Sequence, residues 1–167
     1  MGGPDEELSA LMSEVAVRIL GRGAEWAGER MLGAADIGCI DPNVAACASI
    51  RGYLERRGIS TDELLTDTPE RFQGLQRPVT IVRHPLSGKK RLTAFELSTG
   101  RWSVMLSRHM LFTVIVARQG IEETLRNHQQ SSAGRTLGAE NKEWQGWQAH
   151  MRIWRALKRL KRIVPVE

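Results

Sequence analysis

The chain has few aromatic residues, few cysteines and no apolar run long enough to cross a bilayer. Aromatic residues make up 5% of its 167 residues. Cys39 and Cys47 lie eight positions apart, which fits neither a zinc knuckle nor a disulfide-rich secreted scaffold. The longest near-apolar stretch, 110–117, is much shorter than the roughly 20 residues of a membrane span, and the acidic start MGGPDEEL is unlike a signal peptide. We therefore expect reduced, structural cysteines in a cytoplasmic protein with no membrane partner.

The sequence also lacks the short motifs of common catalytic and cofactor sites. It contains no HExxH pair, GxSxG elbow, Walker loop or GxGxxG. One acid–base grouping, of His84, Glu96 and His109, would form if the strands folded back on one another. Three unrelated residues are the simpler interpretation, because such residues often occur without a role. We predict a protein that is not an enzyme and that needs no cofactor or metal.

Charge is distributed very unevenly along the chain. Residues 1–76 hold 7 Lys and Arg against 13 Asp and Glu, whereas residues 77–167 hold 17 against 6. The net charge of +5 therefore combines a first half of −6 with a second half of +11. A basic region of this strength attracts polyanions, of which nucleic acid is the commonest in a cell. The acidic half is typical of a surface that faces a basic partner or another copy.

The first half has the apolar spacing of helices. Residues 5–32 predict one helix, weakened by glycines near Gly21–Gly23, and 43–58 predict a second that ends at Gly58. Residues 33–42 show no period and predict a loop. Short helices are expected over 60–65 and 68–75, so 45–65 has the outline of a helix-turn-helix. An ordinary helical hairpin is the better explanation of that outline, because the second helix, TDELL, carries acidic residues and no Lys or Arg to contact DNA.

The second half begins with three short runs that alternate between apolar and polar residues. Residues 78–83, 91–97 and 102–106, separated by turns, predict a three-stranded antiparallel meander. A helix is expected over 108–130, although MLFTVIVA within it also fits a buried strand. The predicted fold is α+β, with an N-terminal helical portion, this small meander and two C-terminal helices. Its expected parts are an acidic helical portion (1–76), a basic meander plus helix (77–130), a flexible linker (131–143) and a basic amphipathic helix (144–167).

The terminal helix carries an apolar stripe beside a basic one. Its tryptophans Trp144, Trp147 and Trp154 lie on the apolar stripe, where they would either bind a partner or pack into the chain's own core. Arginine outnumbers lysine among the cations, and its forked donors suit phosphate. The predicted nucleic-acid contacts are Arg83, Lys89, Lys90, Arg91, Arg101, Arg108, Arg152, Arg155, Lys158, Arg159 and Arg162.

Two functions follow from these patterns. The first is an accessory subunit that binds the phosphate backbone of DNA or RNA within a larger nucleoprotein assembly. The second is a protein–protein adaptor, in which the acidic half meets a basic half and the Trp-rich helix docks into a groove. A solvated cationic face without a ligand is the alternative to both.

Overall fold

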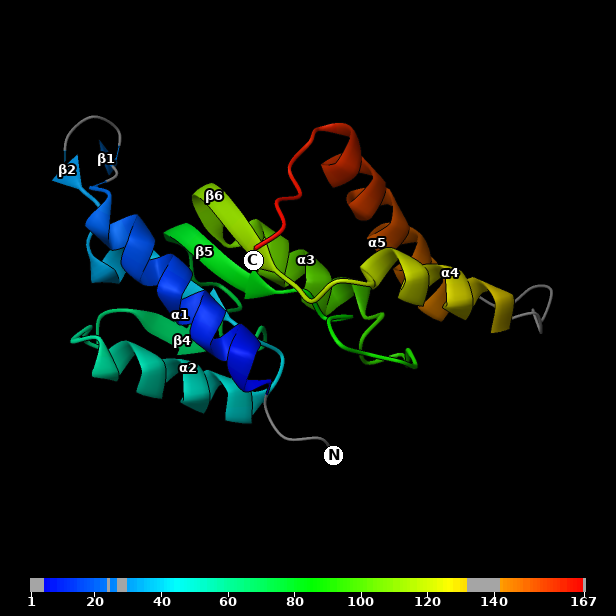
Figure 1. The fold of residues 1–167 in the computed structure, drawn as a ribbon, viewed down its shortest axis with the longest axis horizontal. Helices are drawn as coiled ribbons and strands as arrows, with labels where there is room; N and C mark the ends of the chain where they lie inside the picture. Colours follow the sequence, from blue (N-terminus) through cyan, green and yellow to red (C-terminus); the bar gives the residue numbers. More distant parts are fainter. Residues whose placement is uncertain (1–4, 24, 27–29, 132–141, 167) are drawn as a thin grey trace. The chain divides into compact units, whose positions relative to one another are not determined.

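The centre of the fold is a four-stranded sheet in which every strand runs parallel to its neighbours (Figure 1). The computed structural model describes residues 5–23, 25–26, 30–131 and 142–166. The strand order is β4-β3-β5-β6. The elements are α1 (Glu6–Gly21), β1 (Glu25–Trp26), β2 (Arg30–Met31), the 3-10 helix η1 (Ala34–Asp36), β3 (Ile37–Ile40), α2 (Val44–Arg56), β4 (Leu65–Asp67), β5 (Arg77–Arg83), α3 (Thr99–Ser107), β6 (His109–Val116), α4 (Ile121–Ser131) and α5 (Lys142–Arg159).

The parallel sheet contradicts the predicted antiparallel meander and makes the fold mixed α/β. Only the first of the three predicted strands exists, as β5. Residues 91–97 form turns, because Thr93 donates from its backbone N–H and its hydroxyl to the Glu96 carboxylate and so closes a local turn. Residues 102–106 lie in α3, whose buried Trp102 and Met105 are three positions apart, as one helix face requires.

The predicted helix over 108–130 is also divided differently. Its β-branched first part is β6, which pairs with β5 from Arg77↔His109 to Arg83↔Val116, and only its second part is helical, as α4. Valine, isoleucine and threonine fit a pleated surface better than a helix, so the strand alternative that MLFTVIVA allowed is the one that forms.

Four further predictions in the first half are wrong. The helix predicted over 5–32 ends at Gly21, and the short strands β1 and β2 form in its last part. The short helix predicted over 68–75 is a run of turns. The predicted loop 33–42 contains β3, a central strand that is buried along its whole length. A strand covered on both faces shows no alternation, so its short apolar run IGCI has no period. The second helix of the predicted hairpin is absent as well, because residues 61–64 form a turn and β4 follows.

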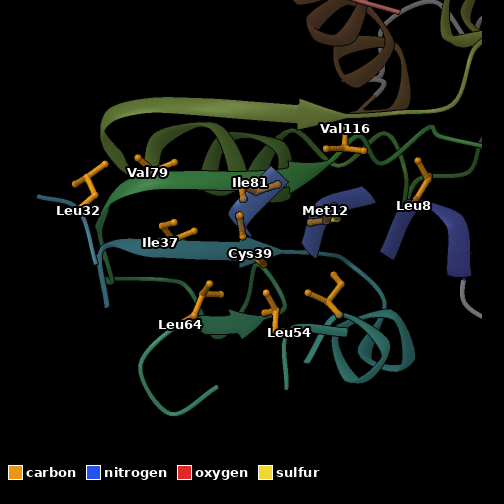
Figure 2. Close-up of a cluster of buried hydrophobic side chains, with 12 residues drawn as sticks. Leu8, Met12, Leu32, Ile37, Cys39, Leu54, Leu64, Val79, Ile81 and Val116 are labelled. Atoms are coloured by element: carbon orange, nitrogen blue, oxygen red, sulfur yellow. The ribbon is translucent and has the colours of Figure 1, made fainter. Parts of the chain in front are cut away.

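The helices α1 and α2 lie side by side and cover one face of the sheet. The first ends at Gly21, where the glycines predicted a break, and the second forms as expected, with Asn43 accepting hydrogen bonds from the N–H groups of Ala45 and Ala46. Figure 2 shows the core that they enclose. Met12 and Leu54 from the helices meet the inward residues of β3 and β5. Both cysteines are buried without a disulfide, and burial raises the pKa of each thiol to about 12, as expected of structural cysteines.

The opposite face of the sheet depends on a glycine. The Phe72 ring, from the connection between β4 and β5, lies against Gly38 of β3, and a Cβ at Gly38 would come within 2.9 Å of that ring. Phe72 is fully buried, so a side chain at position 38 would have to displace the ring within the interior of the protein. The absent side chain of Gly38 is what admits the ring.

The chain divides into two compact units. Unit 1 comprises residues 1–85 and 103–117 and contains the parallel sheet; unit 2 comprises residues 86–102 and 118–167. The linker predicted over 131–143 falls mainly on 132–141, which lie outside the described residues. In the part of the chain that the structure describes, none of the helices combines the length and apolar character needed to cross a bilayer.

Candidate nucleic-acid interface

Unit 2 is built around a close contact between α5 and the segment 86–102. Gly146 of α5 lies directly on the backbone of Leu97, where an added Cβ would be 1.9 Å from the carbonyl oxygen. The Trp147 indole N–H donates to the carbonyl of Leu125 in α4 at 2.7 Å. The terminal helix is therefore packed on its own unit at a fixed position.

This packing accounts for much of the apolar stripe. Trp147 and Met151 are buried, and Trp144 stacks on Trp147 with ring centroids 4.5 Å apart. His150 stacks on Trp102 at 5.2 Å, and burial lowers the pKa of this imidazole to about 4. The tryptophans predicted to bind a partner thus contribute to the core of unit 2, although the half-buried Trp154 also lines a pocket.

The basic face of α5 remains in solvent. Arg152, Arg155, Lys158 and Arg159 are exposed, as is Arg162 just beyond the helix end. Lys158 is exposed but forms an ion pair: its ammonium lies 2.7 Å from the Glu122 carboxylate, which also binds Arg126 at 2.5 Å. The arginines predicted to contact phosphate thus project from a helix whose other side is anchored.

The remaining predicted contacts of unit 2 lie on the segment before α3 and in the first turn of that helix. Lys89 pairs with Glu96 at 3.2 Å. The Arg101 guanidinium lies 3.6 Å from the centroid of the Phe95 ring, a cation–π contact. Lys90 and Arg91 are exposed. Nine of the eleven predicted contacts therefore belong to one compact unit.

The other two predicted contacts belong to unit 1 and are engaged there. Arg83 retains 13% of its side-chain exposure and pairs with the buried Asp41 at 3.3 Å. Arg108 is half-buried and donates to the Ser107 hydroxyl at 2.8 Å. Arg83 is thus a structural cation, and the sequence carries no signal for this because its partner lies 42 positions away.

The carboxyl ends of the parallel strands form a second polar region, which the sequence analysis missed. Ligands of open α/β sheets bind at this edge, where the strand order reverses, here between β3 and β5. Asp41 follows β3, Asp67 ends β4 and His84 follows β5. An acid directly after a short apolar run, as in IGCID and LLTD, was the available signal.

Both acids at this edge, Asp41 and Asp67, form ion pairs with arginines. Asp41 accepts the Asn43 N–H at 2.8 Å and pairs with Arg83; burial raises the pKa of its carboxyl, and Arg83 opposes that effect. Asp67 has Arg71 at 3.5 Å and Arg51 at 3.8 Å. Across the described residues, no group of three His, Cys, Asp or Glu side chains could hold a metal ion. The edge is a set of closed ion pairs that hold strands and loops together.

The acid–base grouping considered from the sequence does not assemble. His84 follows the carboxyl end of β5, where its backbone N–H donates to the carbonyl of Val116. His109 lies opposite Arg77 at the other end of the same strand pair. At about 3.3 Å per residue, the two histidines are roughly 20 Å apart.

Comparisons with protein-family models and with curated proteins find no match to this chain.

Proposed function

We propose that the protein is a non-enzymatic nucleic-acid-binding subunit that holds the phosphate backbone on the basic face of unit 2, within a larger nucleoprotein assembly. Unit 2 contains 14 Lys and Arg against 6 Asp and Glu. A field of this sign raises the local concentration of polyanions and speeds their association.

The observation that carries the proposal is the number of exposed cations without an acidic partner. In unit 2, Glu96 and Glu122 pair with Lys89, Arg126 and Lys158. Within the described ranges, no ion pair involves the exposed side chains of Lys90, Arg91, Arg152, Arg155, Arg159, Lys161 and Arg162. A merely solubilising surface usually intersperses both signs, so a cluster of one sign favours an anionic ligand.

The spacing of the arginines on α5 suits a backbone. Arg152, Arg155 and Arg159 follow one side of the helix, and the seven steps from the first to the last rise about 10 Å at 1.5 Å per residue. A nucleic-acid strand carries about one phosphate per 3.4 Å of duplex axis, so this length faces about three phosphates. Because phosphates carry no sequence information, we expect binding with little sequence preference.

The test is a fluorescence-anisotropy titration of labelled oligonucleotides at 50 and 200 mM salt. The variant replaces Arg152, Arg155 and Arg159 with Gln. If each arginine neutralises one phosphate, the slope of log affinity against log salt for duplex DNA becomes shallower by about 2.7.

The matched control removes the same charge from unit 1, through Gln at the exposed Arg22, Arg56 and Arg57. It should retain the wild-type slope. Equal losses in both triple variants would show a general charge effect and contradict a binding face on α5.

A second candidate function, self-association of an assembly subunit, is favoured by the outer strand of the sheet. β6 is an edge strand of eight residues without Lys, Arg or Pro, and Met110, Leu111 and Phe112 are 47%, 43% and 40% exposed. Natural edge strands usually carry charged residues or proline, which block pairing with another chain. Two copies of β6 would pair about a two-fold axis.

Light scattering on nuclease-treated protein tests this second candidate. The wild type should be a dimer that Leu111→Lys converts to a monomer. A wild type that is monomeric at micromolar concentration would exclude pairing through β6.

A further inference from the structure

We propose that the pocket between α4 and α5 receives one unstacked nucleobase and its phosphate, which would make single-stranded nucleic acid the preferred ligand of unit 2. The inference rests on the proposed function and specifies its ligand. The pocket is lined by Glu122, Arg126, Met151, Trp154, Arg155 and Lys158.

The size of the pocket limits what it holds. Its volume is about 190 Å³, whereas pockets for cofactors and drug-sized ligands measure about 300–1,000 Å³. A dinucleotide cofactor is therefore too large. A single base is small enough, and a base is available for insertion only where a strand is unpaired.

The apolar part of the lining suits a base. Trp154 is half-buried with its indole nitrogen turned away from solvent, and its side chain contributes to the lowered pKa of the Glu122 carboxyl on the same pocket wall. Met151, 7% exposed, supplies a second apolar surface. Every base has a π-face, so an aromatic platform of this kind binds single strands with little sequence preference.

The charged part of the lining suits the attached phosphate. Glu122 occupies Lys158 and Arg126 through contacts of 2.7 and 2.5 Å. Its pKa is lowered, first by the hydrogen bond from Lys158, so the carboxylate stays ionised and those two cations stay paired. Arg155 is the lining cation that has no ion pair among the described residues, and it belongs to the arginine row on α5. A base on Trp154 would thus place its phosphate on a strand path that the proposed function already assigns to α5.

Paired measurements on one single strand and one duplex test the inference. An oligothymidylate of twelve nucleotides and a duplex of equal length are titrated against wild type, Trp154→Leu and Trp154→Phe. Removing one base–aromatic contact should weaken single-strand binding by about 5- to 150-fold, change duplex binding by less than about twofold, and be largely restored by Phe. Trp144→Leu is the matched control, because Trp144 lies on the same helix outside the pocket and should leave both affinities near the wild-type values.

The outcomes separate this inference from the function on which it rests. Unchanged single-strand affinity in Trp154→Leu, or equal losses for strand and duplex, would overturn the inference and leave phosphate binding intact. A wild type that binds neither ligand at low salt would overturn the proposed function as well. Thymidine monophosphate is added as a competitor, and displacement of the strand at submillimolar concentration would show a free-nucleotide site instead.

A measurement on the unaltered protein guards against loss of folding in the variants. A strand that carries 5-bromouracil is irradiated with the wild type, and the linked residue is identified by mass spectrometry. Crosslinking at Trp154 is the expected result, and crosslinks confined to residues outside the pocket would overturn the inference.

Discussion

Replacing Gly146 with alanine sets two opposing effects against each other on α5. In an exposed helix interior the change stabilises by about 0.5–1 kcal/mol, because alanine has less backbone freedom to lose on folding. At Gly146 the new Cβ would be 1.9 Å from the Leu97 carbonyl oxygen and 2.8 Å from its carbon. Ordinary contact begins at 3.4 Å, so the helix or the facing backbone has to move by about 1.5 Å.

The clash should outweigh the gain in helix propensity. Overpacking a well-packed site costs about 1–3 kcal/mol, and here the obstacle is backbone, which has no alternative rotamer. We expect a net loss of about 1–2 kcal/mol after the propensity gain is subtracted, or a fall in melting temperature of roughly 2–8 °C for a chain of this size. The shift of α5 should also weaken nucleic-acid binding.

Thermal melting of Gly146→Ala beside Gly52→Ala measures this balance. Gly52 lies inside α2, where the nearest atom to an added Cβ is the end of the flexible Arg56 side chain at 3.5 Å. That variant should be more stable than the wild type by about 0.5–1 kcal/mol, since propensity acts there without a clash. If Gly146→Ala were as stable as Gly52→Ala, the close packing of α5 on Leu97 would be refuted.

Three further predictions concern charge and backbone conformation. His150 has its pKa lowered to about 4 from 6.5, so as the pH falls the unfolded chain takes up the proton before the folded chain does. The contribution of His150 to the free energy of unfolding is therefore complete above pH 6.5 and is lost as the pH falls toward 4, by about 2 kcal/mol between pH 7 and 5. Urea titrations at the two pH values should show that loss in the wild type but not in His150→Phe. Arg83→Gln leaves the buried Asp41 carboxylate unpaired and should destabilise unit 1 by about 3–5 kcal/mol. Fluorescence anisotropy at low temperature should show unchanged nucleic-acid affinity, and a fall in affinity would show that Arg83 contacts the nucleic acid. Lys161 has a left-handed φ of 53°, so Lys161→Gly should stabilise the end of α5 by about 1 kcal/mol in thermal melts while reducing the salt slope by no more than about 1.

Local patterns were enough to predict three elements of unit 1. The helices α1 and α2 and the strand β5 follow from patterns of apolar and β-branched residues that act within a few positions. The charge asymmetry and the arginine row on α5 are properties of composition and spacing alone. These parts of the fold and of the candidate interface needed no knowledge of distant contacts.

Other features were decided by residues far apart in the chain. The central strand β3 shows no alternation because helices cover one of its faces and the Phe72 connection covers the other. Whether β5 and β6 pair in parallel depends on the segment between them. The local pattern of that segment predicts further strands, but it folds into turns and α3. Periodicity shows which side of a segment is apolar, and it contains no information about which element will cover that side.

The candidate interface divides in the same way. The spacing of the cations and tryptophans along the chain was enough to assign them to the basic and apolar faces of the terminal helix. Which of these side chains remain available depends on folding: Arg83 pairs with Asp41 from 42 positions away, and Trp147 is buried with its indole N–H on the carbonyl of Leu125 in α4. Pairing and burial are properties of neighbours in space, and only folding brings those neighbours together.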